Sequence, residues 1–311
     1  MPDISFLSPV NNVEPFSAKC NERGVRFRPS WLPVIRPLII FLQHSQEKFV
    51  NTPIASRYTL LRLVAAALFI IQSSHAQGSA GADGTIEPRY LIDLPTAGML
   101  PHRNVALDLD FYQDGGLLVS TSVGLFDRLL LGISYGGAGI VGNTSPVWNN
   151  VPGFSLKARI IEESVALPAI ALGFESQGKE TYIERLDRYT IKSLGFYAVA
   201  SKNYQAMGYL SLHGGVNYSL ERADGDSDPN FFVGAEKTLG PIISVLAEYN
   251  LGLNDSNKDA LGRGRGYLNA GIRASLGSGF TIGFNLKDIV RNQQTTSIGN
   301  RTLKCEFVHS I

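Results

Sequence analysis

The stretch "LNAGIRASLGSGFTIGFNLK" (Leu268–Lys287) decides the fold. Apolar residues alternate with polar or small ones in both halves, with Ile272 beside Arg273 and Phe284 beside Asn285. Successive side chains of a β-strand point to opposite faces, so this period of two predicts two strands, each with one apolar and one polar face. The intervening "LGSG" is typical of a tight turn. The stretch therefore predicts an antiparallel hairpin.

The same period of two continues along the chain from residue 105 onward. It is clear in "FSLKARI" (154–160) and in "IISVLAEYNLGL" (242–253). We predict an all-β chain of twelve strands, with boundaries accurate to about three residues. The predicted strands span residues 105–113, 116–125, 129–137, 153–162, 166–176, 191–201, 206–220, 229–237, 241–253, 265–276, 279–289 and 301–311.

Short turns and longer polar loops alternate between these strands. The short turns lie at 126–128, 162–164, 201–204, 237–240 and 276–279, and the long loops at 138–152, 177–190, 221–228, 254–264 and 290–300. Only the short connection at 113–116 departs from the alternation. Short turns at one end and long loops at the other are typical of an outer-membrane barrel. We therefore predict a transmembrane antiparallel up-and-down β-barrel of about twelve strands.

A soluble sandwich or lipocalin-like barrel is the alternative, since these folds also have one wet and one dry face. Two features favour the membrane. Glycines and charges share one face of the predicted strands, as in a polar lumen, and the apolar face is nearly continuous from strand to strand. Tyrosine and phenylalanine lie near its ends, as in the aromatic belts of membrane proteins.

The stretch "LLRLVAAALFIIQSSHAQ" (60–77) has the pattern of a secretory signal peptide. Arg57 and Arg62 precede an apolar run over 63–71, and a small-x-small ending predicts cleavage after Ala76. The run is too short to span a bilayer, which takes about 20 residues.

Residues 1–49 hold six prolines and no sustained period of 3.6 or 2. We interpret them as an untranslated stretch or leader from a misassigned start, with translation beginning near Val50; an unusually long leader is the alternative. Residues 50–76 are then the signal peptide, 77–104 a periplasmic N-terminal segment, and 105–311 the outer-membrane barrel.

Composition excludes several function classes. Beyond residue 76 the chain holds 20 basic and 23 acidic residues, which are the 28 and 27 of the whole chain less the eight and four that precede. This balance gives no footprint for nucleic acid. Cys305 is the one cysteine in that part, so we expect neither a disulfide framework nor a cysteine metal cluster. We expect no cofactor, and we expect outer-membrane lipid, lipopolysaccharide and the barrel-assembly machinery as partners; "GRGRG" (262–266) could meet lipopolysaccharide phosphates.

The inward face of the predicted barrel carries charges of both signs in near balance. A ring of one sign would select ions of the other sign. The mixture instead predicts a narrow interior crossed by salt bridges, or a channel with little charge preference. These lumen-lining residues are Asp108, Asp110, Lys157, Arg159, Glu175, Glu236, Glu248, Arg273, Lys287, Lys304 and Glu306.

His213 is a candidate catalytic residue because Ser211 and Asn217 share its face of the predicted strand. A lipase needs a serine and a histidine in contact, with a third group that orients the imidazole. Here the serine and the histidine stand two apart on one strand, and no second strand offers a recognisable partner. We predict an ordinary lumen histidine and no enzyme.

The predicted loop "ERADGDSD" (221–228) is a weak candidate for calcium. Alternate Asp224, Asp226 and Asp228 could supply oxygen ligands. The full twelve-residue loop spacing of the EF-hand is absent. A solvated acidic loop is the alternative.

Some motifs resemble a known family. "LPTAGMLP" (94–101) and "KARI…LPAIALGF…YAVASKNY" (from 157 to 204) are similar to stretches of the YjbH-like outer-membrane proteins of exopolysaccharide biosynthesis. The resemblance implies a role in polysaccharide export or its regulation, with export components as partners. This chain is shorter than the long members of that family. It ends in "CEFVHSI" (305–311), whereas barrel proteins usually end in phenylalanine, so Phe307 or Ile311 would have to serve as the assembly signal.

Three functions follow as alternatives. The first is an outer-membrane barrel that assists exopolysaccharide or envelope biogenesis or export. The second is a small passive porin for small solutes. The third is a structural or adhesive barrel with a closed lumen. The fold alone does not choose between them.

Overall fold

The computed structural model describes residues 87–205, 207–257, 259–294 and 300–311. The predicted signal peptide (50–76) and the stretch interpreted as a misassigned start (1–49) lie outside these residues. Within the described part, no helix is long and apolar enough to cross a membrane.

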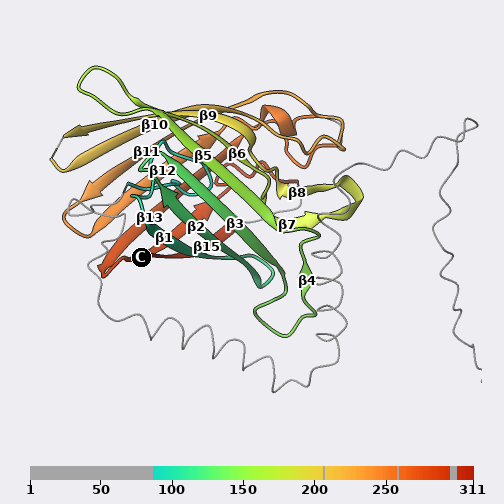
Figure 1. Cartoon of the computed structure of the whole chain (residues 1–311). Helices are drawn as coiled ribbons and strands as arrows, with labels where there is room; N and C mark the ends of the chain where they lie inside the picture. The colour runs from blue at the N-terminus through green and yellow to red at the C-terminus, as the bar shows by residue number, and fades with distance from the viewer. Residues whose placement is uncertain (1–86, 206, 258, 295–299) are drawn as a thin grey trace, which may run out of the picture. The chain divides into compact units, whose positions relative to one another are not determined.

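Twelve long strands form one closed antiparallel sheet (Figure 1). The first strand pairs with both the second and the last, which closes the barrel without a free edge. The strands are β1 Asn104–Tyr112, β2 Gly116–Leu125, β3 Leu129–Ala138, β5 Gly153–Ile161, β6 Ala169–Glu175, β9 Gly195–Gln205, β10 Tyr209–Tyr218, β11 Asn230–Leu239, β12 Ile243–Asn250, β13 Tyr267–Gly277, β14 Phe280–Lys287 and β15 Asn300–Ser310. The predicted twelve-stranded antiparallel barrel is confirmed.

Short elements in the loops were not predicted. They are β4 Val147–Trp148, β7 Lys179–Ile183 and β8 Arg188–Ile191, with the 3-10 helices η1 Glu184–Leu186 and η2 Leu253–Asp255. These elements are short, and the register of β7 with β8 shifts between Lys179 and Tyr182. None of them therefore carries the sustained alternation from which the long strands were predicted.

The two faces of the barrel wall are inverted relative to a soluble protein. Ile272 and Phe284 face outward and are 54% and 50% exposed, whereas Arg273 and Asn285 beside them are 5% and 6% exposed. The same alternation recurs along the other strands, with large apolar side chains outside and polar ones inside. An apolar outer face around a polar interior is the arrangement of a transmembrane barrel.

The two ends of the barrel differ. At one end, called the turn end here, the strands are joined by short turns, and β1 begins beside the end of β15, where Asn104 faces Ser310. The longer loops project from the other end, called the loop end. The loop between β6 and β9 contains the β7–β8 hairpin, called the loop hairpin (residues 179–191).

Residues 87–101, called the lumen hairpin, run inside the barrel (cyan in Figure 1). They fold back on themselves: the N–H of Leu91 donates to the carbonyl of Leu94 at 2.9 Å, and that of Thr96 to the carbonyl of Arg89 at 3.1 Å. The expected periplasmic segment spanned residues 77–104; the structure places residues 87–101 of it inside the barrel, and residues 77–86 lie outside the described residues. Side chains of nine strands, β1, β2, β5, β6, β9, β12, β13, β14 and β15, form hydrogen bonds or ion pairs with these residues. Only a segment in the middle of the barrel can meet strands on all sides.

Candidate functional site

The lumen is the candidate functional site. The structure places all of the predicted lumen-lining charges on the inner face, and most of them contact the lumen hairpin. Sequence reasoning found these residues but missed what they bind.

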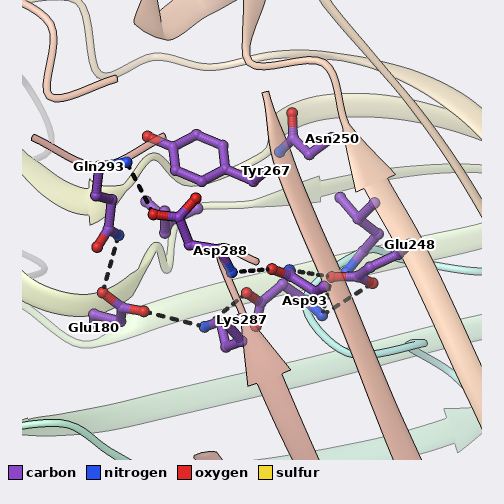
Figure 2. A pocket seen from close by; sticks show the side chains of 11 residues that line it. Asp93, Glu180, Glu248, Asn250, Tyr267, Lys287, Asp288 and Gln293 are labelled. Atoms are coloured by element: carbon purple, nitrogen blue, oxygen red, sulfur yellow. Dashed lines mark hydrogen bonds and ion pairs between the residues drawn. The ribbon is translucent and has the colours of Figure 1, made fainter. Parts of the chain in front are cut away.

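Glu248 on β12 holds the tip of the lumen hairpin by its main chain. Its carboxylate accepts hydrogen bonds from three successive N–H groups, those of Ile92 at 3.0 Å, Asp93 at 3.0 Å and Leu94 at 3.1 Å. The amide of Asn269 donates to the same carboxylate at 2.8 Å. Figure 2 shows Glu248 beside Asp93. Successive N–H groups that converge in this way form an anion-binding nest, and here the anion is a strand side chain.

Lys157 on β5 makes the opposite contact. Its ammonium donates to the carbonyls of Arg89, Thr96 and Gly98 at 2.9, 3.1 and 3.2 Å, and its side chain is almost fully buried. Buried main-chain groups need partners, and this irregular segment can pair few of them internally. The lumen charges therefore supply the hydrogen bonds that the hairpin cannot make to itself.

Arg273 on β13 also contacts the main chain of the hairpin. It donates to the carbonyl of Tyr90 at 2.8 Å and to that of Leu91. Glu236 on β11 lies 3.3 Å from its guanidinium, so an ion pair between two wall strands holds this arginine.

Side-chain ion pairs add to these contacts. Arg89 of the hairpin lies 2.8 Å from Asp108 on β1 and 3.4 Å from Glu306 on β15. Asp108 and Glu306 face each other in the register of the closing β1–β15 pair. At the tip, the carboxylate of Asp93 lies 2.7 Å from the ammonium of Lys287 on β14.

Part of the inner wall is apolar where the hairpin lies on it. Leu94 and Ala97 pack with Tyr197, Val199 and Phe232, in a cluster drawn from β9 and β11. Met99 and Leu100 pack in a second cluster, with Ala106, Leu130 and Val308. Apolar burial therefore contributes to holding the hairpin as well.

Two glycines make room for the hairpin. A Cβ on Gly234 of β11 would lie 2.3 Å from a methyl carbon of Leu91, and one on Gly124 of β2 would lie 2.4 Å from the carbonyl oxygen of Leu100. Neither distance is compatible with a side chain unless the hairpin shifts.

His213 has a serine partner that sequence reasoning missed. The β9–β10 register sets it opposite Ser201, whose hydroxyl lies 2.8 Å from Nδ1. The N–H of Ala97 donates to this same hydroxyl at 2.8 Å, so the serine joins His213 to the lumen hairpin. Nε2 has no hydrogen-bond partner among the described residues, so no carboxylate orients the ring as a catalytic triad requires. The pair positions the hairpin.

The loop acids weighed for calcium are held by cations of the chain itself. Arg188 and Lys192 contact the Asp224 carboxylate at 2.6 and 2.8 Å, and Asp226 accepts from the N–H of Ser256 at 3.0 Å. Burial raises the pKa of Asp224, but the hydrogen bonds from Lys192 and the main chain, with those from Arg188, outweigh it and leave the pKa below its ordinary value. No group of three metal-binding side chains occurs in the part of the chain that the structure describes. The calcium interpretation therefore has no support.

The same cations anchor the loop hairpin. Arg188 lies between Asp224 and Asp255, at 2.6 and 2.7 Å, and is fully buried. Glu221 accepts from the N–H groups of Tyr189 and Ser193 at 3.0 and 3.1 Å. Burial raises the pKa of Glu221 in spite of these two hydrogen bonds. The loop hairpin is thus tied down at the loop end of the barrel.

No family model and no curated protein matches this chain. Solved structures resemble it at low identity. A KdgM porin has a TM-score of 0.41 and 8% identity, over 66% of this chain and 98% of that one. A NanC porin has 0.40 and 7%, over 67% and 99%. The Acinetobacter baumannii outer membrane protein Omp33 has 0.37 and 8%, over 67% and 97%. The fold assignment rests on the closed strand order and the inverted faces, which are those of an outer-membrane β-barrel.

Proposed function

We propose that this protein is an outer-membrane pore whose lumen is closed at rest by its own lumen hairpin. The observation that supports this is the placement of residues 87–101 inside the barrel, held by side chains from strands all around it. Two cavities of about 10 and 30 Å³ beside the hairpin have room for one or a few water molecules. A constitutively open porin would need a continuous water-filled path.

The chemistry of the wall supports a removable closure. A barrel that is filled permanently can use apolar side chains, whereas Glu248, Lys157 and Arg273 carry charges that water can solvate once the hairpin has left. The hairpin also precedes β1, so its departure breaks no strand pairing. Release therefore exchanges hydrogen bonds to the hairpin for hydrogen bonds to water.

Conductance of the purified protein in planar lipid bilayers tests this proposal. We expect the unsubstituted chain to be closed for most of the time, and deletion of residues 87–98 to give steady conductance. The deletion also removes Arg89, so the double variant Glu248→Gln with Lys157→Met provides a second test that keeps every hairpin residue. Equal conductance of all three proteins would overturn the proposal.

The resemblance to YjbH-like proteins supports a narrower proposal, that the pore serves polysaccharide export or its regulation. The motif "LPTAGMLP" that carries the resemblance is the returning arm of the lumen hairpin. Deletion of the gene should then reduce surface polysaccharide, and the unsubstituted gene should restore it. Unchanged polysaccharide with normal adhesion would favour a passive pore, and lost adhesion would favour a structural or adhesive barrel.

We also propose an outer-membrane location, reached through a signal peptide cleaved after Ala76, and no enzymatic activity. The apolar outer wall supports the location. A gel of the outer-membrane fraction should show a band that migrates faster unheated than boiled, with Gln77 as its first residue. A soluble periplasmic band without a heat shift would contradict the location.

A further inference from the structure

Lys287 lies between the two hairpins (Figure 2). It is the last residue of β14, and its buried ammonium is 2.7 Å from Asp93 at the tip of the lumen hairpin. The same ammonium is 3.4 Å from Glu180 of the loop hairpin. One side chain of the wall therefore contacts both hairpins.

The local backbone directs Glu180 into the barrel. Its φ is +69°, in the left-handed region, and the β7–β8 register shifts between the pairs Lys179–Ile191 and Tyr182–Tyr189. A non-glycine residue in that region costs free energy, which the surrounding contacts must offset. Those contacts are the bonds that the carboxylate makes with Lys287, with Gln293 at 3.3 Å and with Asn300. The bulge in β7 serves to place this carboxylate.

A second link runs beside the first. The ammonium of Lys179 lies 3.4 Å from Glu175 and 5.3 Å from the ring centre of Tyr90 on the lumen hairpin. The hydroxyl of Tyr90 donates to Glu175 at 3.1 Å. The loop hairpin thus meets the lumen hairpin through two adjacent residues, Lys179 and Glu180.

We propose that the linked ion pairs Glu180–Lys287–Asp93 couple the two hairpins. Displacement of the loop hairpin then loosens the lumen hairpin, and displacement of the lumen hairpin loosens the loop hairpin. The buried ammonium is shared by two carboxylates, and removal of either leaves the remaining charges poorly compensated where water is scarce. Coupling of this kind is reciprocal by thermodynamic necessity. This inference rests on the proposed function, because it supplies the signal that would open the pore.

The forward test measures how readily the lumen hairpin leaves. Cys305, the one cysteine beyond the predicted cleavage site, is replaced by serine. Ala97→Cys is then introduced, and its modification by a bulky maleimide is timed in lipid vesicles. Glu180→Gln should speed modification roughly tenfold, the order expected when a buried charged group loses one hydrogen bond. Lys287→Met should speed it at least as much, and both substitutions together should add nothing beyond Lys287→Met.

Matched controls isolate the coupling. Glu184→Gln changes an exposed acid of the same loop hairpin and should leave the rate unchanged. Lys287→Arg keeps the charge and should keep the slow rate. A heat shift on gels verifies the barrel in each variant. An unchanged rate in Glu180→Gln would show that Lys287 holds the lumen hairpin without Glu180, and additive effects in the double variant would show that Glu180 acts independently of Lys287. Either result would overturn the proposal.

The reverse test needs no cysteine. Asp93→Asn, inside the lumen, should speed tryptic cleavage after the exposed Arg185 of the loop hairpin, and equal cleavage would overturn the coupling. The pore proposal fails separately. If removal of the lumen hairpin gives no conductance while the two hairpins respond to each other, the coupling stands and the pore does not.

Discussion

The lumen hairpin and the loop hairpin are held in opposite ways. Wall side chains hold the lumen hairpin mainly through its main chain: Glu248 accepts from three N–H groups, and Lys157 donates to three carbonyls. The loop hairpin is held mainly through one of its own side chains, the Arg188 guanidinium, which lies between Asp224 and Asp255 of neighbouring loops. Main-chain contacts do not depend on which side chains the held segment carries. Apart from Arg89 and Asp93, whose side chains pair with the wall, the lumen hairpin should therefore tolerate substitution within itself and be destabilised by changes in the wall. The loop hairpin should be destabilised by changes on both sides.

The largest effect should come from Arg188→Met. It leaves two buried aspartates without their shared cation, and removal of one partner of a buried ion pair costs about 4 kcal/mol. We expect rapid tryptic cleavage of the loop hairpin, followed on gels over time. Arg185→Met, on an exposed arginine of the same hairpin, is the control for charge and should leave the other cleavage sites as slow as before.

Lys157→Met should release the lumen hairpin at a cost of about 3 kcal/mol, because three buried carbonyls lose a charged donor. The rate of modification of Ala97→Cys measures it. Because the two hairpins are proposed to be coupled through Lys287, the loop hairpin should also lose part of its protease resistance. A hairpin that stays seated in this variant would show that apolar packing dominates, and the contrast between the two hairpins would fail.

Asp224→Asn should destabilise the loop hairpin by about 2 kcal/mol at neutral pH, as charged hydrogen bonds from Arg188 and Lys192 weaken. The folded pKa of Asp224 lies below its unfolded value, so its contribution is present above about pH 4 and is lost as the pH falls through the folded pKa. Tryptic resistance after incubation at graded pH should therefore differ between the two proteins at pH 7 and converge in strong acid. A constant difference would contradict this sign.

Met99→Leu should have the smallest effect, below about 1.5 kcal/mol, because it keeps the volume and alters none of the main-chain contacts. The rate of modification of Ala97→Cys should change little. A large increase would mean that side-chain fit, rather than the grip on the main chain, holds the lumen hairpin.

The strands and their two faces could be predicted because a period of two is a local signal. The lumen hairpin could not, since its contacts join residues as far apart in sequence as Tyr90 and Arg273. One signal was available: Leu91, Ile92, Met99 and Leu100 are apolar in a segment expected to be solvated. The pair of Ser201 and His213 was missed because only the strand register reveals it.

Arg89 has a consequence for assembly. The first and last strands meet with Asp108 opposite Glu306, and like charges directly opposite in a sheet repel. The guanidinium of Arg89 reaches both carboxylates from inside the barrel. The segment that lies inside the lumen thus also stabilises the junction of β1 and β15, so a chain that folds with this segment misplaced should have a weaker junction there. Correct placement of residues 87–101 in the lumen is thereby linked to the pairing of β1 with β15 that closes the barrel wall.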